Sequence, residues 1–182
     1  MGEYFKIVNP AKKEYIDALN FGEGIKRRGI LLGKHGLAVG CLVCRGAGKG
    51  ELFGSWAGDD VFIAGDEHPP NEWGITTATP ERPDRNLNQM ARDEYEDISY
   101  KAIVMLCEFD SSMIEEFAKK ASTDSCLLLS LGYAAYQLGY KPIEKALVEI
   151  IGKNWTKQLA AAQNIRRGLS GLPAAHRTVE NP

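Results

Sequence analysis

The sequence has no excess of charge of either sign. Its 22 basic and 24 acidic residues leave a formal net charge of −2 over 182 residues. A protein that holds nucleic acid or an anionic membrane surface needs a basic field or a concentrated basic patch. We therefore expect neither nucleic acid nor a membrane among the partners of this chain.

Long apolar runs are also missing. The two longest apolar stretches, residues 29–44 and 126–138, are interrupted by polar residues, and neither reaches the roughly 18 clean residues that span a bilayer. Residues 1–6 lack the apolar core of a secretion signal, and Lys6 stands where a myristoylation motif has Ser or Thr. These absences predict a cytoplasmic protein.

Cysteine is scarce, with four residues at positions 41, 44, 107 and 126. They are too few and too unevenly spaced for the disulfide framework of a small secreted domain. Cys41 and Cys44 form a Cys-x-x-Cys pair, but a zinc site needs a second ligand pair and a redox site needs a thiol of lowered pKa at a helix start. The apolar surroundings favour buried thiols that pack as small hydrophobic groups, with zinc as the minor alternative.

Signatures of common enzyme classes are absent. Residues 46–50 resemble part of a phosphate-binding loop, but Val43 and Gly50 stand where the Walker motif requires Gly and Ser or Thr. Neither a Gly-x-Ser-x-Gly elbow nor a His-Glu-x-x-His motif occurs. The three histidines are scattered, and only His68 has acidic neighbours in sequence. We expect no cofactor and no metal, and enzyme status is left open.

What is present is an ordinary globular composition, 44% apolar and 25% charged. The length suits one hydrophobic core. We predict one unit over residues 1–168, made of a β-rich lobe (1–98) and a helical part (99–168). A flexible tail (169–182), which has Gly and Pro but no periodicity, follows it.

Strand signals dominate the front half. Residues 4–8 alternate, and residues 14–19 can return after Asn9-Pro10 as the second strand of a hairpin. Residues 30–43 fit a buried strand pair or, as the alternative, one helix, and periodicity does not decide. Two further short strands and a long loop rich in proline are predicted at residues 51–53, 61–64 and 65–89.

Helix signals dominate the last third. They include a Ser99 cap, a capping box of Ser111 or Ser112 with Glu115, a cap at Thr123 or Asp124, Pro142 in a first turn and a cap at Asn154. The predicted helices cover residues 99–107, 113–121, 126–138, 143–151 and 154–167. The fold class expected is α+β, with an N-terminal antiparallel β-rich half and a C-terminal helical third packed on it.

The most distinctive local pattern is Gly-Ser-Trp-Ala-Gly-Asp-Asp at residues 54–60. Its glycines permit positive φ, and Trp56 covers either an edge of the core or a ligand. On the functional interpretation the nearby acids converge with His68 on a concave surface to bind a hard cation or activate water. On the favoured structural interpretation they cap turns. The candidate ligand-binding residues are Ser55, Trp56, Asp59, Asp60, Asp66 and His68.

The helical third holds more apolar positions than one thin stripe needs. We expect most of them to pack on each other and on the sheet. Otherwise part of this surface forms a homo-oligomer interface or a partner groove, in which aromatic residues are the anchors.

Several short segments together resemble one known family. They are Tyr4, Val8-Asn9, Tyr15, Phe21-Gly22-Glu23-Gly24, Gly54-Ser55-Trp56-Ala57-Gly58-Asp59, Gly65-Asp66 and Tyr95-Glu96-Asp97-Ile98-Ser99. In this order they are similar to a family of small bacterial and phage-associated proteins, over roughly residues 1 to 100. That family is uncharacterised, so the resemblance implies no reaction. The helices after residue 100 are additional to it, and residues 30–50 match it poorly.

Two functions from different classes remain. The first is a non-enzymatic binding or protein-interaction protein that uses the 54–68 turn and the following proline-rich loop. The alternative is a carboxylate-centred, metal-dependent hydrolase at Asp59, Asp60 and Asp66.

Overall fold

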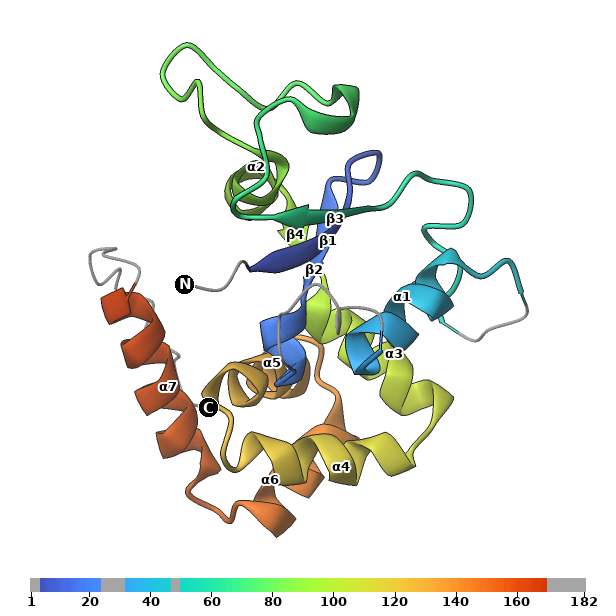
Figure 1. The fold of residues 1–182 in the computed structure, drawn as a ribbon. Helices are drawn as coiled ribbons and strands as arrows, with labels where there is room; N and C mark the ends of the chain where they lie inside the picture. Colours follow the sequence, from blue (N-terminus) through green and yellow to red (C-terminus); the bar gives the residue numbers. More distant parts are fainter. Residues whose placement is uncertain (1–3, 24–31, 47–49, 170–182) are drawn as a thin grey trace.

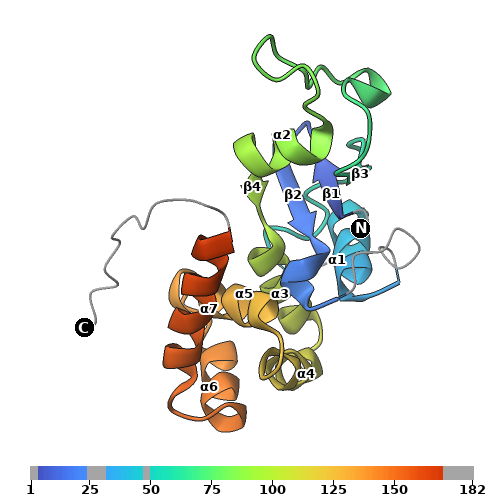
Figure 2. The same ribbon diagram turned by 60° about the vertical axis from the view of Figure 1, so that its left-hand side comes forward.

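The computed structural model describes residues 4–23, 32–46 and 50–169. A four-stranded mixed sheet comes first and a packed region of helices follows, as Figures 1 and 2 show. The elements of the first half are β1 (Phe5–Asn9), β2 (Glu14–Asp17), the 3-10 turn η1 (Ala18–Phe21), α1 (Lys34–Val43), β3 (Phe62–Gly65), η3 (Glu72–Gly74), α2 (Leu87–Glu94) and β4 (Glu96–Asp97). The helices of the second half are α3 (Ser99–Phe109), α4 (Ser112–Ala121), α5 (Ser125–Tyr136), α6 (Lys141–Ile150) and α7 (Trp155–Leu169). The predicted α+β class is confirmed.

The sheet has the strand order β3-β1-β2-β4. The predicted front hairpin is confirmed, because β1 and β2 pair antiparallel with Ile7 opposite Ile16. On its other side β1 pairs antiparallel with β3, while β4 joins β2 in parallel. The sheet is therefore mixed, and a strand of two residues, β4, was not predicted because so short a run carries no periodicity.

Strand β1 is buried on both faces of the sheet. Ile7 and Ile16 belong to the main core. Val8 and Tyr15 point the other way and pack with Leu87 of α2, which covers that face in Figure 1. Neighbouring residues of each strand thus point to opposite faces of the sheet and belong to different hydrophobic clusters, because side chains alternate along a strand. Helix α2 itself was not predicted.

Residues 34–43 form a helix, so the strand pair predicted for residues 30–43 is wrong and the alternative holds. The buried positions His35, Ala38 and Leu42 recur at helical spacing. Gly33, at the N-cap, provides no side-chain hydrogen bond. The carboxylate of Glu23 takes that role instead and accepts hydrogen bonds from the amides of Lys34 and His35.

The strand predicted at residues 51–53 is also wrong. This segment consists of successive turns, in which Phe53 N donates to Gly50 O at 3.3 Å and Ser55 N to Leu52 O at 3.0 Å. The turns place Leu52 and Phe53 against the main core. Short apolar runs fit strands and buried turns equally well.

The helices after residue 98 follow the predicted order. Asp124 caps α5 by accepting from Leu127 N at 2.9 Å, and Pro142 lies in the first turn of α6. The predicted capping box at α4 is wrong, because Ser111 makes no side-chain cap bond. Asp110 accepts from Ser112 N and Oγ instead. Most of the predicted tail, residues 170–182, lies outside the described residues.

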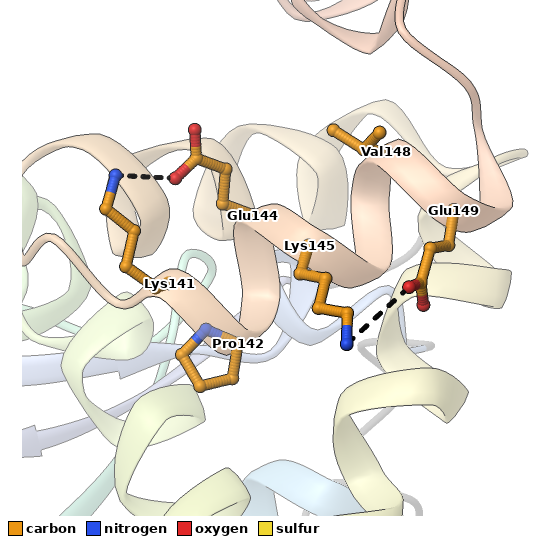
Figure 3. Close-up of a pocket in the computed structure, with 6 residues that line it drawn as sticks. All are labelled: Lys141, Pro142, Glu144, Lys145, Val148 and Glu149. Atoms are coloured by element: carbon orange, nitrogen blue, oxygen red, sulfur yellow. Dashed lines mark hydrogen bonds and ion pairs between the residues drawn. The ribbon is translucent and has the colours of Figure 1, made fainter.

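The outer face of α6 lies beneath an open hollow of about 710 Å³ (Figure 3). All six of the described residues that line it belong to this one helix. Its charges pair along the helix, Lys141 with Glu144 at 2.8 Å and Lys145 with Glu149 at 3.8 Å. These charged side chains form the polar face of an amphipathic helix.

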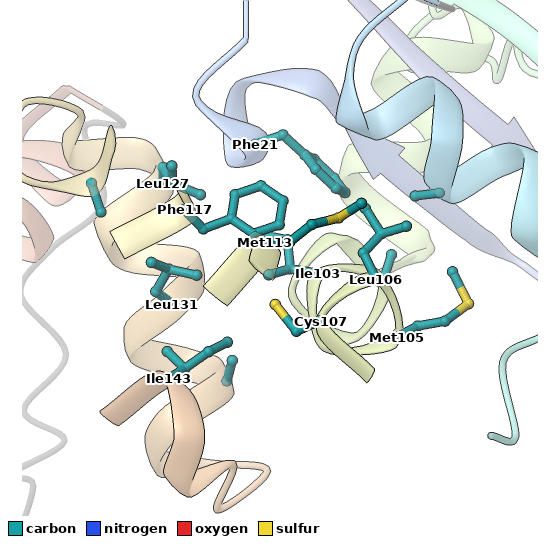
Figure 4. Packing of buried hydrophobic residues seen from close by; sticks show 14 of the residues in the cluster. Phe21, Ile103, Met105, Leu106, Cys107, Met113, Phe117, Leu127, Leu131 and Ile143 are labelled. Atoms are coloured by element: carbon teal, nitrogen blue, oxygen red, sulfur yellow. The ribbon is translucent and has the colours of Figure 1, made fainter. Parts of the chain in front are cut away.

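Helix α5 is the centre of the helical region and packs against α3, α4, α6 and α7. Leu127 and Leu131 of α5 meet Phe117 of α4 and Ile103 of α3 in the core shown in Figure 4. The same cluster includes Ile7 of the sheet. One continuous core therefore joins the two halves. None of the described helices is long and apolar enough to cross a membrane.

A buried polar junction also joins the sheet to the helices. Asp97 of β4 accepts from Ser99 N and Oγ and, at 2.7 Å, from Asn20 Nδ2 of η1. The Ser99 Oγ in turn accepts from Asp17 N at 2.9 Å. Burial raises the pKa of Asp97, and the hydrogen bonds from Ser99 offset only part of that rise.

Candidate functional site

The glycine bend at residues 54–60 lies on the C-terminal end of α1. Gly54 N donates to Cys41 O, and Trp56 N donates to Leu42 O, both at 2.9 Å. Trp56 has no exposed surface, and its Nε1 donates to Glu14 Oε2 of β2 at 2.6 Å. The indole therefore closes the core between α1 and the sheet, and the prediction that Trp56 faces a ligand is wrong.

Gly54 itself has a φ of +73°, and an added Cβ would lie 2.8 Å from the backbone oxygen of Cys44. We expect Gly54→Ala to lower the free energy of unfolding by about 1–3 kcal/mol, because alanine is strained there and backbone cannot easily move aside. Gly40→Ala is the matched control, since a Cβ at this position of α1 meets nothing within 4 Å. Urea unfolding should show Gly40→Ala as neutral or stabilising, and equal losses from both would contradict the geometry.

The other predicted residues of the bend have separate surroundings. Asp59 accepts from Asn9 Nδ2 at 2.9 Å, at the end of β1, whereas Asp60 is exposed. The Ser55 Oγ is buried and has no hydrogen-bond partner among the described residues. Asp59 thus holds the bend to the sheet, in agreement with the structural interpretation.

Asp66 lies at the opposite end of β1. Its Oδ1 accepts from Tyr4 N at 2.8 Å, five residues before the Asn9 that holds Asp59. Along a strand this separation is about 16 Å. No group of three His, Cys, Asp or Glu side chains suited to a metal exists in the described part of the chain. The predicted convergence of Asp59, Asp60 and Asp66 is therefore wrong.

His68 leads to the part of the loop that sequence reasoning missed. Its Nδ1 lies 2.9 Å from Glu72 Oε2. Its ring packs edge-on against Phe5, at 5.9 Å between centroids, and is tilted against Trp73, at 5.3 Å. Trp73 also lies 5.3 Å from the ring of Phe62. We call His68, Trp73 and Phe62, with Phe5 in contact with His68, the aromatic platform.

Trp73 is the exposed member of the platform. Its side chain remains 42% exposed, although it packs on two rings. Its backbone has a φ of +58°, and Asn71 nearby has a φ of +56°. For a bulky residue this left-handed conformation is uncommon and costs about 1–3 kcal/mol. The surrounding loop must hold it in place.

That loop, residues 66–86, is ordered by side chains that bond to its backbone. Asn71 and Thr77 bond each other's amides, with Thr77 N to Asn71 Oδ1 at 2.8 Å and Asn71 N to Thr77 Oγ1 at 2.9 Å. The hydroxyl of Thr77 then donates to Arg85 O. Asn86 Nδ2 donates to the carbonyls of Asp66 and His68, which closes the loop at its base.

Two arginines attach the loop to α2. Arg82 pairs with Asp93 and the buried Arg85 with Glu94. Burial alone would raise the pKa of Asp93, but hydrogen bonds from Arg82 and Arg92 outweigh it, so that this pKa is lowered. A long segment without regular structure thus becomes a rigid support for Trp73.

Two of the cysteines are buried in the core. These are Cys41 and Cys107, whereas Cys44 is exposed. Burial raises the pKa of Cys41, and it raises that of Cys107 to about 12, so neither thiol is activated. The prediction of buried thiols that pack as hydrophobic groups is confirmed for these two.

Most of the apolar positions in the helical third are buried in the core, as expected. The exposed ones include Tyr133 and Tyr136 of α5, and Leu138 just after it. Tyr133 packs on Tyr100, and Tyr136 stacks on Trp155. A homo-oligomer through these helices stays a prediction.

No family model, no curated protein and no solved structure matches the chain.

Proposed function

We propose that the protein is a non-enzymatic binding protein that recognises a partner protein through loop 66–86. The observation that carries the proposal is Trp73, a half-exposed indole at a φ of +58° on the rings of His68 and Phe62. Strained residues of this kind are concentrated at functional sites, and tryptophan is the residue most enriched at binding hot spots.

The rigidity of the loop supports this role. The hydrogen bonds of Asn71, Thr77 and Asn86 fix the backbone on both sides of Trp73. A loop that is ordered before binding loses little conformational entropy in the complex, so more of the contact energy appears as affinity. Trp73 itself has only two side-chain torsions to restrict.

The charge of the loop indicates what kind of partner fits. Residues 66–86 contain five acidic and two basic residues. Both basic residues, Arg82 and Arg85, are paired with acids of α2. The excess of acidic residues in this loop favours a partner with a basic surface and an apolar pocket for the indole. Affinity for such a partner falls as the salt concentration rises.

The glycine bend and the acidic residues that the sequence indicated as a site do not support a function. Trp56 is fully buried, so the 54–60 bend offers no ring to a partner. Asp59 and Asp66 bind opposite ends of β1. A hydrolase built on both of these acids has no geometric support.

We expect Trp73→Ala to weaken partner binding by at least about thirtyfold, which corresponds to the roughly 2 kcal/mol that defines a hot spot. Immobilised protein captures partners from a lysate of the source cells, and mass spectrometry compares wild type, Trp73→Ala and Phe109→Ala. Phe109 is the matched control, because it is an aromatic side chain of α3 that is 64% exposed and packs on another ring, Phe53.

Affinities are then measured with the purified partner at low and high salt. A partner that Trp73→Ala releases, that Phe109→Ala keeps and that is bound more weakly at high salt supports the proposal. The proposal fails when every partner is held equally by wild type and Trp73→Ala, or when Phe109→Ala causes the same loss.

A further inference from the structure

A second candidate site lies where η1 follows the sheet, and Phe5 and Asp66 link its wall to the aromatic platform and its loop. Two hollows meet there. One, of about 370 Å³, is lined by β1 and by α2, and the other, of about 230 Å³, lies between η1, α5 and α7. Asp17 and Leu19 line both. We call the two hollows together the junction cleft.

The sheet end of the cleft is polar and carries both signs of charge. Lys6 and Arg92 are its cations, and Asp17 and Asp66 are its anions. Lys6 Nζ pairs with Asp17 Oδ2 at 2.6 Å, and each of these side chains is only 12% exposed. A charged pair that is so little exposed has lost much of its hydration, so it needs polar partners from the protein or from a ligand.

The charged groups are bonded to one another and to the backbone but are not saturated. Asp17 accepts from Lys6 Nζ through Oδ2 and from Leu19 N through Oδ1, and a carboxylate offers about four lone-pair sites. Lys6 has three N–H groups, of which one bonds Asp17 while the ammonium lies 5.3 Å from the ring centre of Tyr15. Arg92 bonds Asp93 through Nε, which leaves its terminal nitrogens directed by no bond among the described residues. Asp66 uses Oδ1 for the amide of Tyr4.

The helical end of the cleft is apolar. Leu129, Ala162 and Ile165 line it, and Ile165 is 61% exposed. Leu19 lines both this end and the charged end. The lining of the cleft therefore changes from charged on one side of Leu19 to apolar on the other.

We propose that the junction cleft binds a small zwitterion with an apolar side chain, that is, a free apolar α-amino acid. Its carboxylate meets Lys6 and Arg92, and its ammonium group meets Asp17 and Asp66. Its side chain passes Leu19 into the apolar end. The balanced charges disfavour a simple anion, which the two aspartates repel, and a simple cation, which Lys6 and Arg92 repel. The volume of the polar hollow lies within the usual range for ligand pockets.

The test uses L-leucine, L-phenylalanine and L-methionine as probes, each titrated into ¹⁵N-labelled full-length protein. We expect saturable shifts of the amides of Leu19 and Gln89 with a dissociation constant at or below about 1 mM for at least one probe. Two analogues remove one charge each, 4-methylpentanoate without the ammonium group and 3-methylbutylamine without the carboxylate. Both are analogues of L-leucine, and each should bind at least tenfold more weakly than L-leucine.

Variants locate the site. Arg92→Gln changes an exposed side chain and should weaken the best probe at least fivefold without loss of folding. Lys12→Met on the exposed hairpin turn is the control and should change nothing. Lack of saturation by all three probes at about 10 mM overturns the proposal. The proposal is also overturned if both analogues bind as tightly as L-leucine, or if Arg92→Gln and wild type bind the best probe with equal affinity. None of these results depends on Trp73, so the partner-binding proposal is tested separately.

Discussion

Replacing Trp56 with alanine should lower the free energy of unfolding by about 3–5 kcal/mol, the usual cost of truncating a fully buried aromatic side chain. The indole has no exposed surface and joins α1, the glycine bend and β2 in one cluster. Its loss leaves a cavity and removes the hydrogen bond to Glu14. A loss of this size is a large part of the total stability of a small protein.

The control is Trp73→Ala, which removes the same side chain from an exposed site. We expect its free energy of unfolding to change by no more than about 1 kcal/mol. Urea unfolding of both variants, followed by circular dichroism, gives the comparison. If Trp73→Ala were as destabilising as Trp56→Ala, the assignment of one ring to the core and the other to the surface would be wrong.

Glu23→Gln should lower stability by about 2 kcal/mol at pH 7. Glu23 accepts hydrogen bonds from the amides of Lys34 and His35 and pairs with the ring of His35. Burial alone would raise the pKa of Glu23, but its hydrogen bonds with His35 and Lys34 outweigh it and lower the pKa from 4.5 to about 2. The full shift would correspond to about 3 kcal/mol, which we reduce because the carboxylate is partly exposed.

The direction in which this stability difference changes with pH follows from the lowered pKa of Glu23. A carboxylate whose pKa is lowered by folding stabilises the protein above its ordinary value and loses that contribution as the pH falls through the folded value. The difference between wild type and Glu23→Gln should therefore be complete above pH 4.5 and shrink toward pH 2. Glu81→Gln makes the same charge change at an exposed position and should show no such trend. A constant difference for Glu23→Gln down to pH 2 would contradict the account.

Glu23 also explains why the sequence did not decide between a strand pair and a helix for residues 30–43. The usual signals of a helix start lie within four residues of it, as Asp124 and Pro142 do for α5 and α6. The cap of α1 comes from a carboxylate 11 residues before Lys34. No local pattern carries that information, so periodicity alone had to choose between strand and helix.

The candidate site shows the same contrast between features with a local sequence signal and features that depend on distant residues. The pattern around Trp56 is conspicuous in sequence because its glycines are needed for a tight bend, yet the bend has a structural role. Trp73 carries no such signal: its platform forms from rings at positions 5, 62 and 68, which only the pairing of β1 with β3 and the path of the loop bring together. The one local signal was the length of the proline-rich loop, since long loops without regular structure are commonly functional.

The most direct test of the central claim is ¹⁹F NMR of protein labelled with 5-fluorotryptophan, which gives one signal for each of the three tryptophans. Trp73→Phe identifies the signal of Trp73. We predict that a soluble paramagnetic agent broadens this signal strongly and those of Trp56 and Trp155 weakly, and that a bound partner removes the broadening. The account is contradicted if Trp56 is broadened as strongly as Trp73, or if the partner leaves the Trp73 signal as accessible as before.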